Sequence, residues 1–117
     1  MAKKKTVISK NYLDRIPVRP SHIKWRTADD IVTLEIENTG FMNRLAQKLF
    51  KKPKVSYIHL EKIGSFVWQT MDGEKTVTDL GKEVEAKFGE EAYPLYERLA
   101  KYFQTLDSYG FINWVSI

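Results

Sequence analysis

Residues 60–112 read LEKIGSFVWQTMDGEKTVTDLGKEVEAKFGEEAYPLYERLAKYFQTLDSYGFI. Apolar residues recur in this stretch at the three- and four-residue spacing of amphipathic helices. The three helical segments end at Asp72-Gly73, at Gly89 and at Gly110, and Gly73 supplies the positive φ that the C-terminal end of a helix favours. Residues 111–117, FINWVSI, then predict a closing strand.

The second and third helices carry further signals. Thr76 is the expected N-cap of the second helix, and Asp79 follows it in the position of a capping box. Pro94 suits the first turn of the third helix. The broad apolar face of that helix comprises Leu95, Leu99, Tyr102, Phe103 and Leu106. A face this wide fits a helix that contacts the core on one side and a ligand on the other, and equally a core helix held between two layers.

Strands are predicted in the first half of the chain. Residues 22–27 (HIKWRT) and 31–37 (IVTLEIE) alternate between apolar and polar side chains, and Asp29-Asp30 between them predicts a turn. The pair is therefore expected to form an antiparallel hairpin with one buried face. Residues 54–60 (KVSYIHL) are rich in β-branched and aromatic side chains and predict a third strand.

A basic segment lies between the second and third strands. Residues 41–52 (FMNRLAQKLFKK) place apolar side chains at helical spacing, and Pro53 ends the pattern. Arg44, Lys48 and Lys51 fill the polar side of this expected helix, where they could dock an acidic partner. The alternative is a helix that simply covers the sheet or core.

These elements predict an α+β fold. We expect a winged-helix-like domain over residues 21–117, in which an N-terminal three-stranded antiparallel sheet precedes a three-helix bundle and an extra helix is inserted between strands 2 and 3. Residues 1–20 contain few apolar side chains and three consecutive lysines, so we expect a basic, largely disordered tail there. Within it, Tyr12, Leu13 and Ile16 could pack loosely against the domain.

Composition excludes several classes of protein. The 117 residues contain no cysteine, which excludes disulfides, thiol nucleophiles and cysteine-ligated metals. The chain has no apolar run long enough to span a bilayer, and no apolar segment follows the basic start, so we expect no signal peptide. A cytoplasmic location fits this composition.

The sequence shows no catalytic constellation. His22 and His59 both fall in expected strands without a second ligand at metal-binding spacing. The serines lack a nucleophile-elbow context, and the six glycines are too scattered for a phosphate loop. We therefore expect a protein that is not an enzyme and that holds no cofactor or metal of its own.

Charge is distributed unevenly. Residues 1–60 carry 13 Lys/Arg against 5 Asp/Glu, whereas residues 61–117 carry 6 against 10. A winged helix would suggest a DNA-binding regulator, but its reading helix should then be basic, and here the helical half is net negative. A second possible function is that of a protein–protein adaptor that docks through residues 41–52. Both are alternatives to the peptide binding described next.

Peptide binding uses the third strand and the last helix. An extended peptide could add to the sheet along Val55, Ser56, Tyr57, Ile58, His59 and Leu60. Leu95, Leu99 and Tyr102 could form the wall of the groove. Because strand and helix are rigid already, such binding costs little in ordering.

Residues 60–112 as a whole resemble the PqqD family, named for pyrroloquinoline quinone biosynthesis. The shared features are a leucine-led first helix, the Asp72-Gly73 turn, the start Thr76-Val77-Thr78-Asp79, and a last helix that ends before Gly110-Phe111-Ile112. The resemblance implies a chaperone or recognition element for ribosomally made peptides, which binds the leader of a precursor peptide on the third strand. It also implies a modifying enzyme as partner, often of the radical S-adenosylmethionine type, that brings its own cofactors.

Overall fold

A computed structural model of the chain describes residues 10–37 and 55–115. Its elements in chain order are α1 (Lys10–Leu13), β1 (Pro17–Val18), β2 (Lys24–Ala28), β3 (Ile31–Glu37), β4 (Val55–His59), α3 (Lys62–Thr70), α4 (Val77–Phe88), the 3-10 helix η2 (Gly89–Ala92), α5 (Leu95–Ser108) and β5 (Asn113–Trp114). The α+β class, the three-stranded antiparallel sheet and the three helices are confirmed. The comparison with a winged helix stays a prediction.

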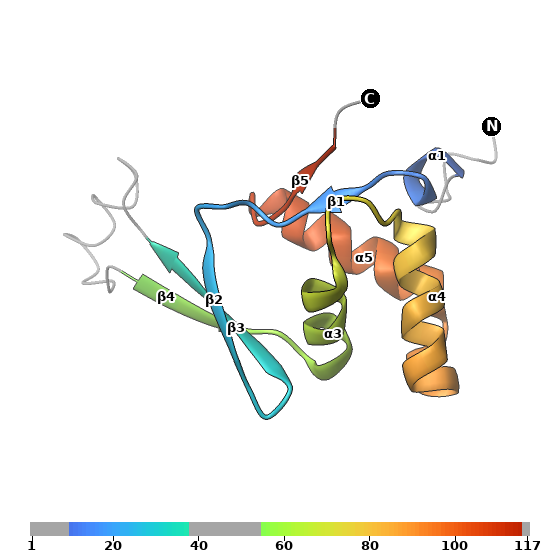
Figure 1. The fold of residues 1–117 in the computed structure, drawn as a ribbon, viewed down its shortest axis with the longest axis horizontal. Coiled ribbons are helices and arrows are strands. Elements are labelled where there is room, and N and C mark those ends of the chain that lie inside the picture. The colour runs from blue at the N-terminus through green and yellow to red at the C-terminus, as the bar shows by residue number, and fades with distance from the viewer. Residues whose placement is uncertain (1–9, 38–54, 116–117) are drawn as a thin grey trace.

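The sheet has the strand order β2-β3-β4 and lies to one side of the helices (Figure 1). Ala28 pairs with Ile31, so only Asp29 and Asp30 form the loop, and both have positive φ, 53° and 66°. This is the backbone that a two-residue hairpin with right-handed twist requires, and Asp tolerates it better than most residues. The predicted antiparallel hairpin is therefore confirmed, but its expected buried face is present only on β3, because all five residues of β2 are exposed.

Helix α3 packs on the face of the sheet that carries Val32 and Leu34, which are both fully buried. Ser65 of α3 makes the polar link across this contact. Its hydroxyl accepts a hydrogen bond from the Val32 amide at 2.8 Å and donates one to the Leu60 carbonyl at 3.2 Å. The Leu60 amide in turn donates to the Val32 carbonyl at 2.9 Å. The start of α3 is thereby tied to β3.

The expected signals at the helix ends are largely present. Thr76 and Asp79 form the capping box of α4, and Gly73 and Gly110 have φ of 80° and 77°. The position of Pro94 differs, because it is the N-cap of α5 rather than a residue of its first turn. The 3-10 helix η2 was not expected from the sequence.

Residues 10–18 of the expected tail pack against the rest of the domain in the structure. Residues 10–18 cross the helices, and β1 pairs with β5 as a two-stranded ribbon beside α5 (Figure 1). The amide of Val77 donates to the Arg15 carbonyl at 3.0 Å, and the Thr78 hydroxyl donates to the Leu13 carbonyl at 3.1 Å. A few apolar residues are enough to hold residues 10–18 in place, because the helices and β5 supply most of the surface that they contact.

Arg19 anchors the same segment to the end of α3. Its Nη1 atom donates to the carbonyls of Trp68 and Met71, both at 2.7 Å, and its guanidinium lies 5.2 Å from the Trp25 ring centroid. A cation at this place satisfies carbonyls that have no partner within the helix. The expected inserted helix, residues 41–52 with Arg44, Lys48 and Lys51, lies outside the described residues.

Replacing Ser65 by Ala should destabilise the fold by about 1–3 kcal/mol, because the buried amide of Val32 loses its acceptor. Urea unfolding of the two proteins measures this difference. The control is Ser108→Ala, whose hydroxyl is exposed on α5 and whose loss should change the free energy of unfolding by less than about 0.5 kcal/mol. Equal stability of the two variants would contradict the role given to Ser65.

The turn after α3 predicts a pH dependence. The hydrogen bond from the Lys75 ammonium, followed by those from the Glu74 and Lys75 amides, lowers the pKa of Asp72 from 3.8 to about 2. A lowered pKa in the folded protein stabilises it above the unfolded pKa, and this contribution is lost as the pH falls through the folded pKa. The stability gap between wild type and Asp72→Asn should therefore shrink between about pH 4 and pH 2. A carboxyl titration by NMR that gives a pKa near 4 would contradict this.

Candidate functional site

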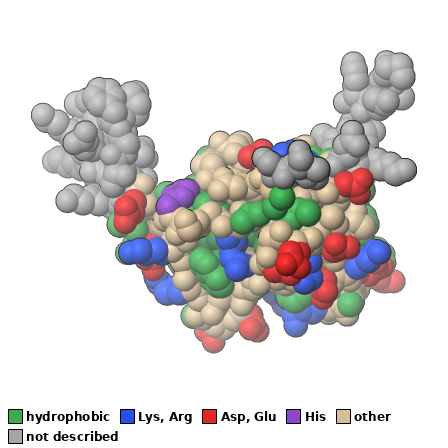
Figure 2. Space-filling view, turned by 45° about the horizontal axis from the view of Figure 1, so that its top comes forward, with side chains coloured by type: hydrophobic (Ala, Val, Ile, Leu, Met, Phe, Trp, Pro, Cys, Tyr) green, Lys and Arg blue, Asp and Glu red, His purple; other side chains and the backbone are tan. Residues whose placement is uncertain are grey.

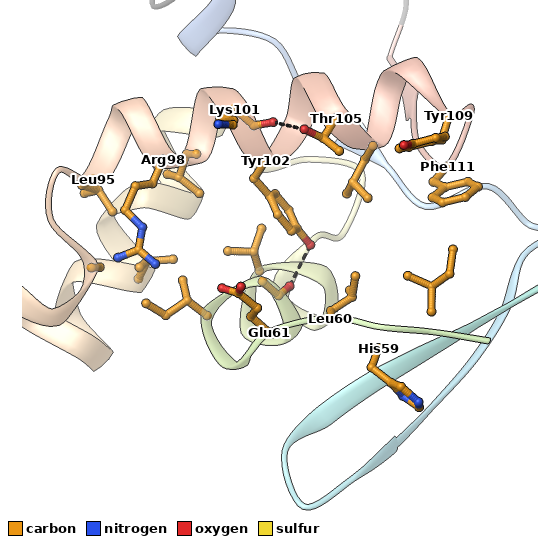
Figure 3. A pocket seen from close by; sticks show the side chains of 18 residues that line it. His59, Leu60, Glu61, Leu95, Arg98, Lys101, Tyr102, Thr105, Tyr109 and Phe111 are labelled. Atoms are coloured by element: carbon orange, nitrogen blue, oxygen red, sulfur yellow. Dashed lines mark hydrogen bonds between the residues drawn. The ribbon is translucent and has the colours of Figure 1, made fainter. Parts of the chain in front are cut away.

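An apolar groove of about 710 Å³ lies between α5 on one side and the segment from β4 into α3 on the other (Figure 3). We call it the groove throughout. A volume of this size falls within the range of ordinary ligand sites. Its apolar floor is built from two helices, with Leu95, Leu99, Tyr102 and Leu106 from α5 and Ile63 and Val67 from α3.

Tyr102 determines the depth of the groove at its centre. Its hydroxyl donates a 2.7 Å hydrogen bond to the Gly64 carbonyl, so the ring spans from α5 to α3 (Figure 3). Burial raises the pKa of Tyr102, which keeps the phenol protonated and able to donate. The close approach of the Tyr102 ring to α3 requires glycine at position 64, because a Cβ atom there would lie 2.8 Å from Cε1 of Tyr102.

The outer edge of β4 lies beside the groove. β4 pairs with β3 on one side, and none of the described strands lies on the other side. Because Leu60 directs its amide to β3, the alternation along the strand directs the backbone groups of Ile58 to β3 as well. The N–H and C=O groups of Tyr57 and His59 therefore point to the outer edge, where an extended chain could pair with them.

The rims of the groove are polar. Arg98, Lys101 and Thr105 follow one another along the α5 rim, whereas His59 and Glu61 lie on the opposite rim. The ring of His59 shares a 2.8 Å hydrogen bond with the Thr33 hydroxyl, which is the role of a structural sheet histidine.

The structure brings six of the nine predicted peptide-binding residues together at the groove: Ile58, His59, Leu60, Leu95, Leu99 and Tyr102. Val55, Ser56 and Tyr57 lie further along β4 and do not line the groove. Arg98 and Lys101 were not predicted from the sequence, although their spacing of three and six residues from Leu95 places them beside the apolar face. Gly64 was not predicted either, because its role depends on a contact with a distant helix.

The described residues contain no group of three or more side chains suited to hold a metal ion. None of the helices among them is both long and apolar enough to cross a membrane. Acidic and basic side chains are interspersed on the face seen in Figure 2, which is unlike the continuous basic surface that duplex DNA selects.

A family model described as coenzyme PQQ synthesis protein D (PqqD) matches residues 30–112. The chain belongs to the PqqD family. The match confirms the resemblance found in the sequence, and it covers every element that builds the groove, from β3 to the end of α5. No curated protein and no solved structure matched the chain.

The PqqD match begins at residue 30, so it leaves out α1, β1 and β2. In the structure β2 nevertheless pairs with β3 along its whole length, from Lys24 opposite Glu35 to Ala28 opposite Ile31. This PqqD-family domain therefore includes N-terminal residues beyond the matched ones.

Gly64→Ala should test the packing at the centre of the groove. The added methyl group overlaps the Tyr102 ring, and overpacking of this kind costs about 1–3 kcal/mol, whereas Ala gains at most about 1 kcal/mol of helix propensity over Gly. We expect a net loss of stability in urea unfolding. In a Tyr102→Leu background the overlap is absent, so Gly64→Ala should lower the free energy of unfolding less, or even raise it. An equal cost in both backgrounds would contradict the contact.

Proposed function

We propose that this protein is a non-catalytic chaperone that binds the leader of a ribosomally synthesised precursor peptide. The leader adds to the outer edge of β4 as a further strand and packs against α5. The observation that carries the proposal is the direction of the Tyr57 and His59 backbone groups at this edge, directly beside the groove.

Strand addition suits this edge for two physical reasons. Backbone hydrogen bonds supply affinity whatever the guest sequence is, and apolar floor residues such as Leu95 and Leu99 select among its side chains. Both sides of the site are regular elements packed on one core, so they lose little freedom when the guest binds.

The chemistry of peptide modification is assigned to a partner enzyme, in keeping with the family's description as a coenzyme synthesis protein. We propose an enzyme of the radical S-adenosylmethionine type, which would hold its own cofactors and receive the peptide from the groove. Docking through Arg44, Lys48 and Lys51 stays a prediction, because these residues lie outside the described part of the chain.

Titration of the isotope-labelled protein with the leaders of peptides encoded beside its gene tests the proposal. We expect the backbone amides of Tyr57, His59 and the groove side of α5 to shift on binding. His59→Pro removes one outward N–H without removing a β3–β4 hydrogen bond, and it should weaken binding at least about tenfold.

Two controls separate the backbone effect from other causes. His59→Ala removes the same side chain and keeps the N–H, so it should bind the leader nearly as the wild type does. Thr27→Pro removes an outward N–H from β2, the opposite edge of the sheet, and should leave binding unchanged. Strand addition at β4 would be contradicted if Thr27→Pro and His59→Pro lost affinity for the leader equally. It would also be contradicted if the amide shifts on binding were confined to residues before β1.

A further inference from the structure

The groove has two chemically different ends. Figure 3 places Leu95 and Arg98 near one end of α5 and Tyr109 and Phe111 at the other. The first end carries charged rims, whereas the second is aromatic. A guest that lies along α5 would therefore meet different chemistry at its two ends.

Arg98 is held in place at the charged end. Its Nη1 atom donates to the carbonyl of Glu91 at 2.9 Å, which fixes the guanidinium at the rim. A guanidinium has five N–H donors, so this bond leaves others to face the groove. Arg98 can therefore bind an oxygen of a guest without first being ordered.

Lys101 adds a second cation one turn further along the same rim. Among the described residues neither Arg98 nor Lys101 forms an ion pair. Glu91, whose backbone carbonyl accepts the hydrogen bond from Arg98, has its carboxylate 3.9 Å from the ammonium of Lys62 instead. Glu61 faces them from the opposite rim, which directs an anionic guest group toward α5.

The aromatic end is formed by Tyr109 and Phe111. Their rings are stacked with centroids 5.4 Å apart and planes inclined by 23°. Tyr109 is 67% exposed although it is a large apolar side chain, so a guest side chain can reach it. Such a surface favours a large apolar or aromatic side chain.

We propose that the groove selects acidic guest segments. The guest carries one or two carboxylate side chains where it passes Arg98 and Lys101, and a large apolar side chain at Tyr109 and Phe111. Arg98 and Tyr109 are separated by about 16 Å along α5, which an extended chain spans in about five residues. This inference rests on the proposed function and adds to it the chemical class of the peptide.

Three synthetic peptides of about ten residues serve as probes. They differ only at two adjacent positions, which are Glu-Glu, Gln-Gln or Lys-Lys, and each has a Phe about five residues away. Each peptide is made in both sequence orders, because the direction of the guest strand relative to β4 determines which order fits. Amide shifts of Tyr57 and His59 report strand addition, and fluorescence anisotropy gives the dissociation constants.

The wild type should bind the Glu-Glu peptide about tenfold more tightly than the Lys-Lys peptide, with Gln-Gln between them, and added salt should reduce the difference. In Arg98→Glu/Lys101→Glu the order should reverse. The control Lys24→Glu/Lys82→Glu changes the net charge equally at exposed positions outside the groove, and it should keep the wild-type order.

The outcomes separate this inference from the proposed function. Equal affinity for the three peptides, with β4 amide shifts in each, overturns the acidic selection and leaves strand addition standing. The acidic selection is also overturned if both double variants change the order of peptide affinities equally, because the net charge of the protein would then explain the change. Absence of β4 shifts with every peptide overturns both the inference and the function on which it rests.

Discussion

The hydrogen bonds that join Val32, Leu60 and Ser65 connect the two halves of this protein. They turn the chain from β4 into α3 while keeping it against β3, so α3 must cover the face of the sheet that carries Val32 and Leu34. The outer edge of β4 is thereby left toward α5 rather than toward α3. The groove is a consequence of that turn, because its two walls are the strand before the turn and the helix that returns across the bundle.

The contact between Tyr102 and Gly64 fixes part of the floor of the groove. An apolar space between two helices would ordinarily be filled by side chains, since interiors pack densely. Here the Tyr102 hydroxyl holds its ring on the backbone of α3, and the absent side chain of Gly64 lets the ring approach that backbone closely. The result is a floor with a fixed position, which is what a binding site needs if little freedom is to be lost on binding.

The polar rims are where we propose that this apolar groove gains specificity. Burial of apolar surface alone would accept many guests, whereas Arg98 and Lys101 favour one sign of charge at one place. Membership of the PqqD family agrees with a site that binds a peptide and leaves chemistry to another protein. In the function that we propose, the charged rim would select which peptide this chain binds.

Local signals in the sequence determined the helices, the hairpin and the family. The capping box at Thr76, the Asp29-Asp30 turn and the order of motifs up to Gly110 depend on neighbouring residues, so they could be read without the structure. Only the tertiary structure decided how residues 10–20 pack on the helices and that Gly64 and Arg98 line the groove. These features depend on contacts between residues far apart in the chain, and such contacts leave no periodic pattern in the sequence.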